Sequence, residues 1–336
     1  MFEDKTVLTG IKPTGTPHLG NLVGAIKPVI DMSNEAEKSY IFIADLHALN
    51  AVRDSGLIEK WTNEVAATFL ALGLDTKKTV FFRQSDVSEI YKLTVMLMNV
   101  TSKGLMNRSH AYKAVSAENV ENGNAPDAGI NMGLYTYPIL MAADILLYNT
   151  DVVPVGQDQK QHVEMARDIA GSFNHIYNDE ILVVPTPVIP KATSAIPGLD
   201  GRKMSKSYEN HIPIFAEPKK LKKSIMRIVT DSKRPEEPKN PDESTIYLLY
   251  QHFAPKDKAD EMREQFTNGG LGYGDAKKML FEMINTNMEE PRSKYYELLA
   301  HPERIDEVLQ DGAKRAQTVA VETVNKVSNA MLGKTI

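Results

Sequence analysis

Residues 6–32 read TVLTGIKPTGTPHLGNLVGAIKPVIDM, and this stretch decides the fold. Its opening residues, 6–9, are short, apolar and partly β-branched, which favours a buried strand. A loop rich in proline and glycine follows, and a helical pattern starts near Asn21. A strand that runs through such a loop into a helix N-terminus presents free backbone N–H groups to an anion. The stretch therefore predicts a strand–loop–helix unit with an anion site in the loop.

Short apolar strands and helical segments alternate through the first two-thirds of the chain. Strands are predicted at 6–9, 40–44, 79–82, 152–155 and 181–184, and helices at 21–32, 57–72, 88–100, 138–148 and 159–173. Such alternation is typical of a parallel sheet with helices on both faces and ligands at the carboxyl ends of the strands. We expect an α/β fold with a Rossmann-like, doubly wound, parallel five-stranded sheet.

The pattern becomes almost entirely helical after Ser207. Residues 217–229 have helical spacing, residues 232–242 are a polar linker, and apolar residues recur at helical spacing near the end of the chain. We predict a catalytic domain at residues 1–215, with a helical insertion at about 88–135. A mostly helical region at residues 216–336 follows it.

The composition excludes several classes of protein. The 336 residues contain no cysteine, which rules out disulfides and thiolate-bound zinc or iron–sulfur clusters. The eight histidines lack metal-ligand spacing, so we expect no metal held by the protein itself. The apolar run at 139–148 is too short to span a membrane, and the first strand leaves no room for a signal peptide. We therefore expect a cytoplasmic protein. The net charge of −5 still permits a nucleic-acid partner, because the basic run at 219–223 can hold phosphates.

A second motif, KMSKS at residues 203–207, follows a glycine-bearing loop. Lys203 and Lys206 are three residues apart, so in a turn both can face one phosphate cluster, and the two serines add hydroxyl donors. Displacement at phosphorus needs positive charge where negative charge accumulates on the leaving pyrophosphate. Neither motif is a P-loop or a dinucleotide fingerprint. Together, PHLGN at 17–21 and KMSKS predict two halves of one ATP site in an enzyme that activates a carboxylate.

One carboxylate lies in the apolar helical segment at 137–148. Tyr137, Met141, Asp144 and Tyr148 fall on one stripe of that helix. Burial of an unpaired carboxylate is costly, so Asp144 needs a hydrogen-bond donor. The donor can be an internal partner or a substrate group, and an indole N–H serves as well as a phenol O–H. The residues alone leave two aromatic substrates open.

The paired motifs resemble those of class I aminoacyl-tRNA synthetases, although Asn21 stands where many members have a second histidine. The run from 135 to 168, with Asp144 and VPVGQDQKQH at 153–162, is similar to bacterial tryptophanyl-tRNA synthetases almost residue for residue. A weaker similarity extends over residues 10–232. The resemblance implies that ATP activates L-tryptophan to tryptophanyl-adenylate with release of pyrophosphate, followed by transfer to tRNA(Trp). It also implies a homodimer, Mg²⁺ that arrives with ATP, and an anticodon-binding role for the helical region.

The resemblance assigns roles to individual residues. His18, Lys203 and Lys206 are the expected catalytic residues. Asp144 receives the indole N–H, Tyr137 and Gln159 hold the amino-acid head group, and Asp158 binds the ribose of ATP. The expected tryptophan-binding residues are Leu8, His47, Tyr137, Met141, Asp144, Val153, Val155 and Gln159. The expected ATP-binding residues are Lys12, Thr14, Gly20, Asn21, Gly156, Asp158, Lys203, Met204, Ser205 and Lys206. Leu8 departs from the family, in which this position is often aromatic.

Three rival interpretations remain at this level. A ligase specific for tyrosine would use a related pocket, but the walls formed by Met141 and residues 153–155 favour indole, the larger apolar ring. A nucleotidyltransferase can share the first motif, but the long helical tail argues against it. A catalytically inactive RNA-binding relative is disfavoured because His18 and both lysines are present.

Overall fold

A five-stranded parallel sheet, in the order β3-β2-β1-β4-β5, forms the centre of the fold. The computed structural model describes residues 2, 4–189 and 196–336. The strands are β1 (Thr6–Ile11), β2 (Lys38–Ile43), β3 (Thr79–Arg83), β4 (Val152–Pro154) and β5 (Thr186–Val188). β1 pairs with β2 along its whole length, from Thr6 opposite Lys38 to Ile11 opposite Ile43. The predicted fold class and the doubly wound parallel sheet are confirmed.

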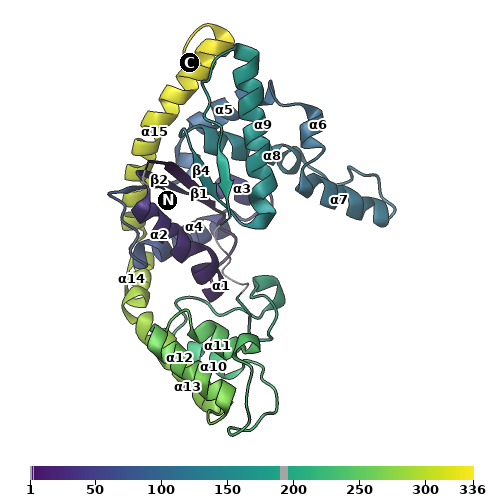
Figure 1. The fold of residues 1–336 in the computed structure, drawn as a ribbon. Coiled ribbons are helices and arrows are strands. Elements are labelled where there is room, and N and C mark those ends of the chain that lie inside the picture. Colours follow the sequence, from purple (N-terminus) through teal and green to yellow (C-terminus); the bar gives the residue numbers. More distant parts are fainter. Residues whose placement is uncertain (1, 3, 190–195) are drawn as a thin grey trace.

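Helices surround the sheet and continue beyond it (Figure 1). They are α1 (Leu19–Asn21), α2 (Lys27–Glu35), α3 (Asp45–Ala48), α4 (Ser55–Ala71), α5 (Glu89–Met98), α6 (Lys103–Met106), α7 (His110–Glu121), α8 (Met132–Leu146), α9 (Lys160–Tyr177), α10 (Pro218–Met226), α11 (Thr245–Tyr250), α12 (Lys256–Asn268), α13 (Tyr273–Asn287), α14 (Glu289–Ala300) and α15 (Pro302–Leu332). Within the described part of the chain, none of these helices is both long and apolar enough to cross a membrane.

The helix predicted at 21–32 is built from three pieces. α1 is followed by a π-helical turn, Leu22–Ile26, and then by α2. Pro28 lies in the first turn of α2, and a proline has no N–H to bond the carbonyl four residues earlier and clashes with it. The backbone N–H of Lys27 instead bonds the carbonyl of Leu22, five residues back, which gives the wider turn.

The fifth strand lies later than predicted. The sequence indicated 181–184, whereas β5 is Thr186–Val188 and pairs with β4. The backbone of Leu182 is occupied by a side chain, because its N–H donates to Oδ1 of Asn174 at 3.0 Å and its carbonyl accepts from Nδ2 of Asn174 at 2.8 Å. A residue whose backbone groups are already paired in this way has no need of a sheet ladder.

Alternate residues of the central strands point into two separate hydrophobic cores. Leu8, Tyr40, Phe42 and Phe82 belong to the core that contains α5, α8 and α9. Ile41, Ile43 and Phe81 belong to the core on the opposite face, which contains α4 and reaches α10 to α14. Successive side chains of a strand point to opposite faces of the sheet. Because both faces are covered by apolar cores, these strands are continuous hydrophobic runs in the sequence.

The last helix, α15, returns to the sheet. It runs along one side of the molecule, whereas α10 to α13 gather at one end (Figure 1). Its residues Ala313, Ala316, Ala320, Val324 and Val327 are buried in the core shared with α5, α8 and α9. The predicted domain division at residues 215/216 is therefore crossed by a helix from the second region, and the division itself remains a prediction.

The contact of α15 with β3 has no room for another atom. A Cβ placed on Gly312 would lie 1.9 Å from the carbonyl oxygen of Phe81. We predict that Gly312→Ala lowers the free energy of unfolding by about 1–3 kcal/mol, because the helix must move off the strand. Urea unfolding followed by circular dichroism measures this change.

Gly171→Ala is the matched control, because it also lies inside a helix (α9) and a Cβ there meets no atom within 4 Å. It should stabilise the protein by about 0.5–1 kcal/mol through higher helix propensity. Equal changes in the free energy of unfolding for the two substitutions would show that the close contact with β3 does not contribute to stability.

Candidate active site

The first motif lies in the loop between β1 and α1. His18 is the N-cap of α1, and its Nδ1 accepts from the N–H of Asn21 at 3.3 Å. In return, Oδ1 of Asn21 accepts from the N–H of His18 at 3.1 Å. This reciprocal pair satisfies two backbone donors at the helix start. It also fixes the orientation of the His18 ring, which is buried.

The loop is tied to the helix behind it. The Thr16 hydroxyl donates to Oε2 of Glu64, on α4, at 2.7 Å, and Glu64 is buried. A cavity of about 470 Å³ lies on this side, between Thr16, α4, α10 and α14. The hydrogen bond from Thr16 to Glu64 therefore anchors the loop between β1 and α1 to α4.

Two glycines allow the second motif to approach the first. Gly15 has a φ of +93°, which favours glycine, and a Cβ there would lie 2.9 Å from Nζ of Lys206. A Cβ on Gly20 would lie 3.0 Å from Nδ1 of His18 and 3.3 Å from Cβ of Met204. A side chain at Gly15 would strain the backbone and displace the end of Lys206, and one at Gly20 would press on His18 and Met204.

The structure brings the two motifs into direct contact. The N–H of Gly20 lies 3.2 Å from Sδ of Met204, and Nζ of Lys206 donates to the carbonyl of Thr14 at 2.8 Å. The contact continues along the backbone, where the N–H of Leu19 donates to the carbonyl of Ile212 at 2.9 Å. Segments about 190 residues apart in the sequence thus form one site.

Burial sets the charge state of this site. Burial, and then the charges of Lys206 and His211, lower the pKa of His18 to about 4. Burial also lowers the pKa of Lys206, and the carboxylate of Glu64 acts in the opposite direction. At neutral pH the ring of His18 is therefore uncharged.

Asn210 holds the loop that carries the second motif. It is buried, its Oδ1 accepts from the N–H of Ser205 at 2.8 Å, and its Nδ2 donates to Oδ1 of Asp200 at 2.7 Å. Nδ2 also lies 3.2 Å from the carbonyl of Lys203. One amide side chain therefore links three parts of the loop, which favours movement of the loop as a single body.

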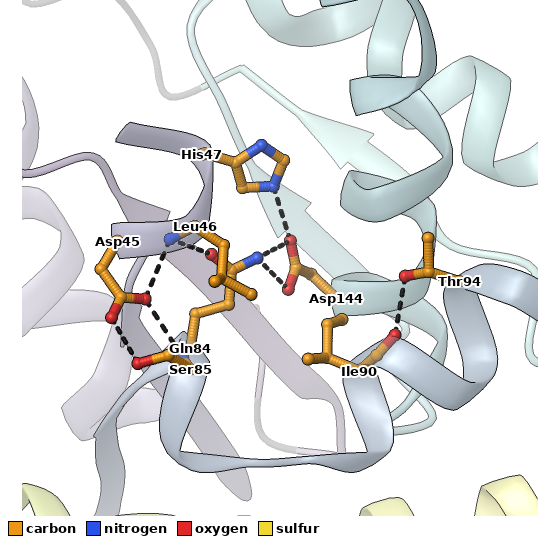
Figure 2. Close-up of polar contacts among 8 residues, drawn as sticks. All are labelled: Asp45, Leu46, His47, Gln84, Ser85, Ile90, Thr94 and Asp144. Atoms are coloured by element: carbon orange, nitrogen blue, oxygen red, sulfur yellow. Dashed lines mark hydrogen bonds and ion pairs between the residues drawn. The ribbon is translucent and has the colours of Figure 1, made fainter. Parts of the chain in front are cut away.

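The single acid of α8 is buried against the segments that follow β2 and β3. Asp144 is 3% exposed, and its carboxylate is held by two side chains from neighbouring strand ends (Figure 2). Nε2 of His47 lies 2.8 Å from Oδ2, and Nε2 of Gln84 lies 2.7 and 2.9 Å from the two oxygens. Burial raises the pKa of Asp144, and the hydrogen bonds from His47 and Gln84 oppose that rise.

These contacts settle part of the sequence-based question about Asp144. Internal donors do exist, yet an ionised carboxylate offers about four acceptor positions and the two side chains fill about three. Asp144 is therefore held in place by the protein, and its acceptance of a substrate N–H remains a prediction.

Asp45 connects the two strand ends that supply these donors. Its carboxylate accepts from the backbone N–H of Leu46 at 3.0 Å and of Ser85 at 3.1 Å, and from the Ser85 hydroxyl at 2.5 Å (Figure 2). The segments after β2 and β3 are thereby fixed to each other, next to Gln84 and His47.

The residues predicted to surround the indole ring share one apolar cluster. Leu8 and Val153 are buried in it, and Met141 and Val155 pack against it. Tyr137 meets the ring of His47 edge-on, with centroids 5.8 Å apart. Its hydroxyl is within hydrogen-bond distance of His162, whose Nδ1 lies 3.1 Å from Oε1 of Gln159.

The other predicted residues follow the carboxyl ends of β1 and β4 or belong to the second motif. Lys12 and Thr14 are exposed in the loop after β1, and Gly156 and Asp158 are exposed just after β4, where Oδ2 of Asp158 accepts from Gln159 at 3.0 Å. Lys203 is exposed and does not share in the contacts of Met204 and Lys206 with the first motif. The chemical roles of all these residues remain predictions.

Sequence reasoning missed two polar residues of the pocket, Gln84 and His162. Gln84 directly follows β3 and is 2% exposed, so its place at the carboxyl end of a parallel strand was the available signal. His162 is the last residue of the similar run at 153–162, but the resemblance assigns it no role. Within the described residues, no cluster of three or more histidine, aspartate or glutamate side chains has metal-binding geometry.

Comparison with known proteins gives one consistent result. Residues 3–289 match the family described as tRNA synthetases class I (W and Y). The chain is 49% identical over 328 residues to a tryptophan–tRNA ligase of Pseudomonas aeruginosa, covering 97% of the chain and 73% of that protein. It is 49% identical over 329 residues to the tryptophan–tRNA ligase of Neisseria meningitidis, covering 97% of each. It is also similar to the crystal structure of tryptophanyl-tRNA synthetase from Campylobacter jejuni complexed with ADP and tryptophan, with a TM-score of 0.87, 40% identity, and coverage of 97% and 99%.

The buried His162 predicts a pH dependence of stability. Burial is the main cause that lowers its pKa from 6.5 to about 4. Between these two values the unfolded chain binds a proton there and the folded chain does not, so stability is lost as the pH falls. We expect His162 to contribute about 2 kcal/mol of this loss between pH 7 and pH 5. His162→Gln should remove that share from the difference between urea unfolding curves at the two pH values.

His175→Gln is the control, because it removes an exposed histidine from the same helix, α9. It should leave the loss of stability between pH 7 and pH 5 as in the wild type. A His162→Gln protein that loses as much stability as the wild type over that range would contradict the assignment.

Proposed function

This chain belongs to the tRNA synthetases class I (W and Y) family, and on that premise we propose that it is the ligase that joins tryptophan to its tRNA. It activates L-tryptophan with ATP to tryptophanyl-adenylate, releases pyrophosphate, and transfers the tryptophanyl group to tRNA(Trp). The observation that carries the proposal is the buried carboxylate of Asp144, held by His47 and Gln84 with about one acceptor position left, beside the apolar cluster that contains Leu8 and Val153.

Asp144 selects the substrate by accepting the indole N–H. A buried acceptor that loses its donor costs more than an ordinary contact, so such a site rejects rings that cannot donate. Met141, Val153 and Val155 form the apolar walls around the ring, with Leu8 packed in the same cluster. Tyr137 and Gln159, both in contact with His162, hold the ammonium and carboxylate groups of the amino acid.

The paired motifs hold ATP. The backbone around Gly20 and Asn21 and the side chains of Lys12 and Thr14 line one side of the nucleotide, and Gly156 and Asp158 take the ribose side. Met204, Ser205 and the two lysines of the second motif cover the other side. His18, with its lowered pKa, is a neutral hydrogen-bonding group at the phosphates. Mg²⁺ arrives bound to the ATP phosphates, as hard cations prefer phosphate oxygen ligands.

The first step is an in-line displacement at the α-phosphorus of ATP. A carboxylate oxygen of tryptophan forms the new P–O bond while the bond to the bridging oxygen breaks, and pyrophosphate leaves with the electron pair. Lys203 and Lys206 stabilise the charge that accumulates on the leaving group, and the pocket supplies positioning. In the second step, a terminal ribose hydroxyl of the tRNA attacks the carbonyl carbon, and AMP leaves.

The helical region is the proposed tRNA side of the molecule. Exposed lysines at 219, 220, 222 and 223 on α10 form a basic surface suited to phosphates, and residues 216–336 are proposed to include the anticodon-binding part. We place this activity in the cytoplasm, where charged tRNA is consumed.

The substrate assignment is tested by ATP–pyrophosphate exchange with each of the twenty amino acids in a separate reaction. Tryptophan should support exchange and tyrosine should not, because the walls and the acceptor fit the indole. Charging of tRNA(Trp) should follow. Exchange supported by tyrosine, or by no amino acid, would contradict the proposal.

Lys206→Ala is the matched loss-of-function variant in the same assay. Removal of one charge-stabilising group should lower the exchange rate about 10²-fold, with little change in tryptophan affinity. Lys219→Ala, on the exposed face of α10, serves as the control and should keep wild-type exchange.

We also propose that two copies of the chain associate through α5. The inner face of this helix, with Ile90, Leu93, Met96 and Leu97, is buried in the core. Its outer face exposes Tyr91, Val95 and Met98 to 48%, 60% and 42%, at the helical spacing of one stripe. A contiguous exposed apolar stripe of this kind is typical of a protein–protein interface.

Val95→Asp places a charge in the middle of that stripe. Analytical ultracentrifugation should give twice the chain mass of 37.4 kDa for the wild type and the single-chain mass for the variant. Val229→Asp, at another exposed valine (66%), should remain a dimer. A wild-type protein of single-chain mass at micromolar concentration would refute the dimer.

A further inference from the structure

His211 lies outside both motifs and next to both. It follows the second motif by four residues, and its neighbours pair with the first motif along the backbone. The N–H of Leu19 donates to the carbonyl of Ile212 at 2.9 Å, and the N–H of Ile214 donates to the carbonyl of Pro17 at 3.2 Å. This pairing brings the ring of His211 to the ring of His18, with 5.8 Å between centroids.

The first motif supplies only one imidazole of its own. Asn21, three residues after His18, is committed to the helix cap, because its Oδ1 holds the backbone N–H of His18. His211 therefore places a second imidazole beside His18, and this imidazole comes from the segment that follows the second motif. The region where residues 17–21 meet residues 203–214 is called the seam below.

The ring of His211 has unused hydrogen-bonding capacity. Its Nδ1 is buried and has no hydrogen-bond partner among the described residues. An unmade hydrogen bond at a buried polar atom costs about 1–3 kcal/mol, so such atoms in native proteins often mark a functional site.

The groups around His211 favour an anion. His18 and Lys206 face it from the two motifs, and Glu209 is the neighbouring carboxylate. Burial, and then the charge of Lys206, lower the pKa of His211, and Glu209 opposes this. A polyphosphate entering the seam would reverse the effect, because a nearby negative charge favours the protonated ring.

We propose that His211 donates a hydrogen bond to the polyphosphate of ATP, beside His18 and Lys206. The proposal rests on the proposed function and adds a residue to its ATP site. Once the phosphates are bound, His211 takes up a proton and contributes positive charge to the leaving pyrophosphate.

The test is steady-state ATP–pyrophosphate exchange by His211→Ala with ATP and tryptophan varied separately. We expect kcat/KM for ATP to fall about tenfold or more, as for one hydrogen bond to a charged group. The KM for tryptophan should stay within about twofold, and the thermal midpoint should not fall, because the buried Nδ1 has no partner to lose. His175→Ala, an exposed histidine on α9, should match the wild type in every measurement.

A second measurement does not depend on a variant. Histidine NMR resonances of the wild-type protein, assigned with His211→Ala and followed against pH, should show a higher pKa for His211 when pyrophosphate is added. His175 should show no change.

The outcomes separate this inference from the function it rests on. A wild type without tryptophan-dependent exchange would refute the function itself. If the wild type is active, two results would each refute the role of His211 alone. One is a kcat/KM for ATP that stays within about twofold in His211→Ala. The other is a pKa of His211 that does not change when pyrophosphate is added.

Discussion

The parallel pairing of β1 with a strand on each side is the constraint on which the rest of the structure depends. β1 lies between β2 and β4, and the chain crosses over at this point in the strand order. Because every strand is parallel, the segments that follow β1, β2, β3 and β4 all leave the sheet at one edge. These segments carry the first motif, His47, Gln84 and residues 156–159, so this topology brings the residues of both predicted sites to one end of the sheet.

The buried acid of α8 depends on that arrangement. An isolated carboxylate among Ile139, Ile145 and Leu146 would lose its hydration without compensation. The strand ends supply His47 and Gln84 as donors, and Asp45 fixes those strand ends to each other. The carboxylate of Asp144 is therefore held by groups of the protein itself, from segments that are fixed to each other.

The contact between the motifs has a different physical basis. The second motif is held against the first by backbone pairing near Pro17 and Leu19 and by the contacts of Met204 and Lys206. Burial lowers the pKa of His18 to about 4, so its ring is neutral at neutral pH, and burial also lowers the pKa of Lys206. The proposed function places an anion at this site and a hydrogen-bond donor at Asp144.

The sequence by itself determined the fold class, the order of most elements and the segments that carry chemistry, because apolar periodicity and turn residues are local signals. It predicted the strands from β1 to β4, but it placed the fifth too early, since only the structure reveals that Asn174 occupies the backbone of Leu182. The partners of Asp144, the return of α15 to β3 across Gly312, and the meeting of His18 with His211 were decided by tertiary structure alone. Each joins residues far apart in the chain, and no local pattern encodes which distant side chain will satisfy a buried polar group.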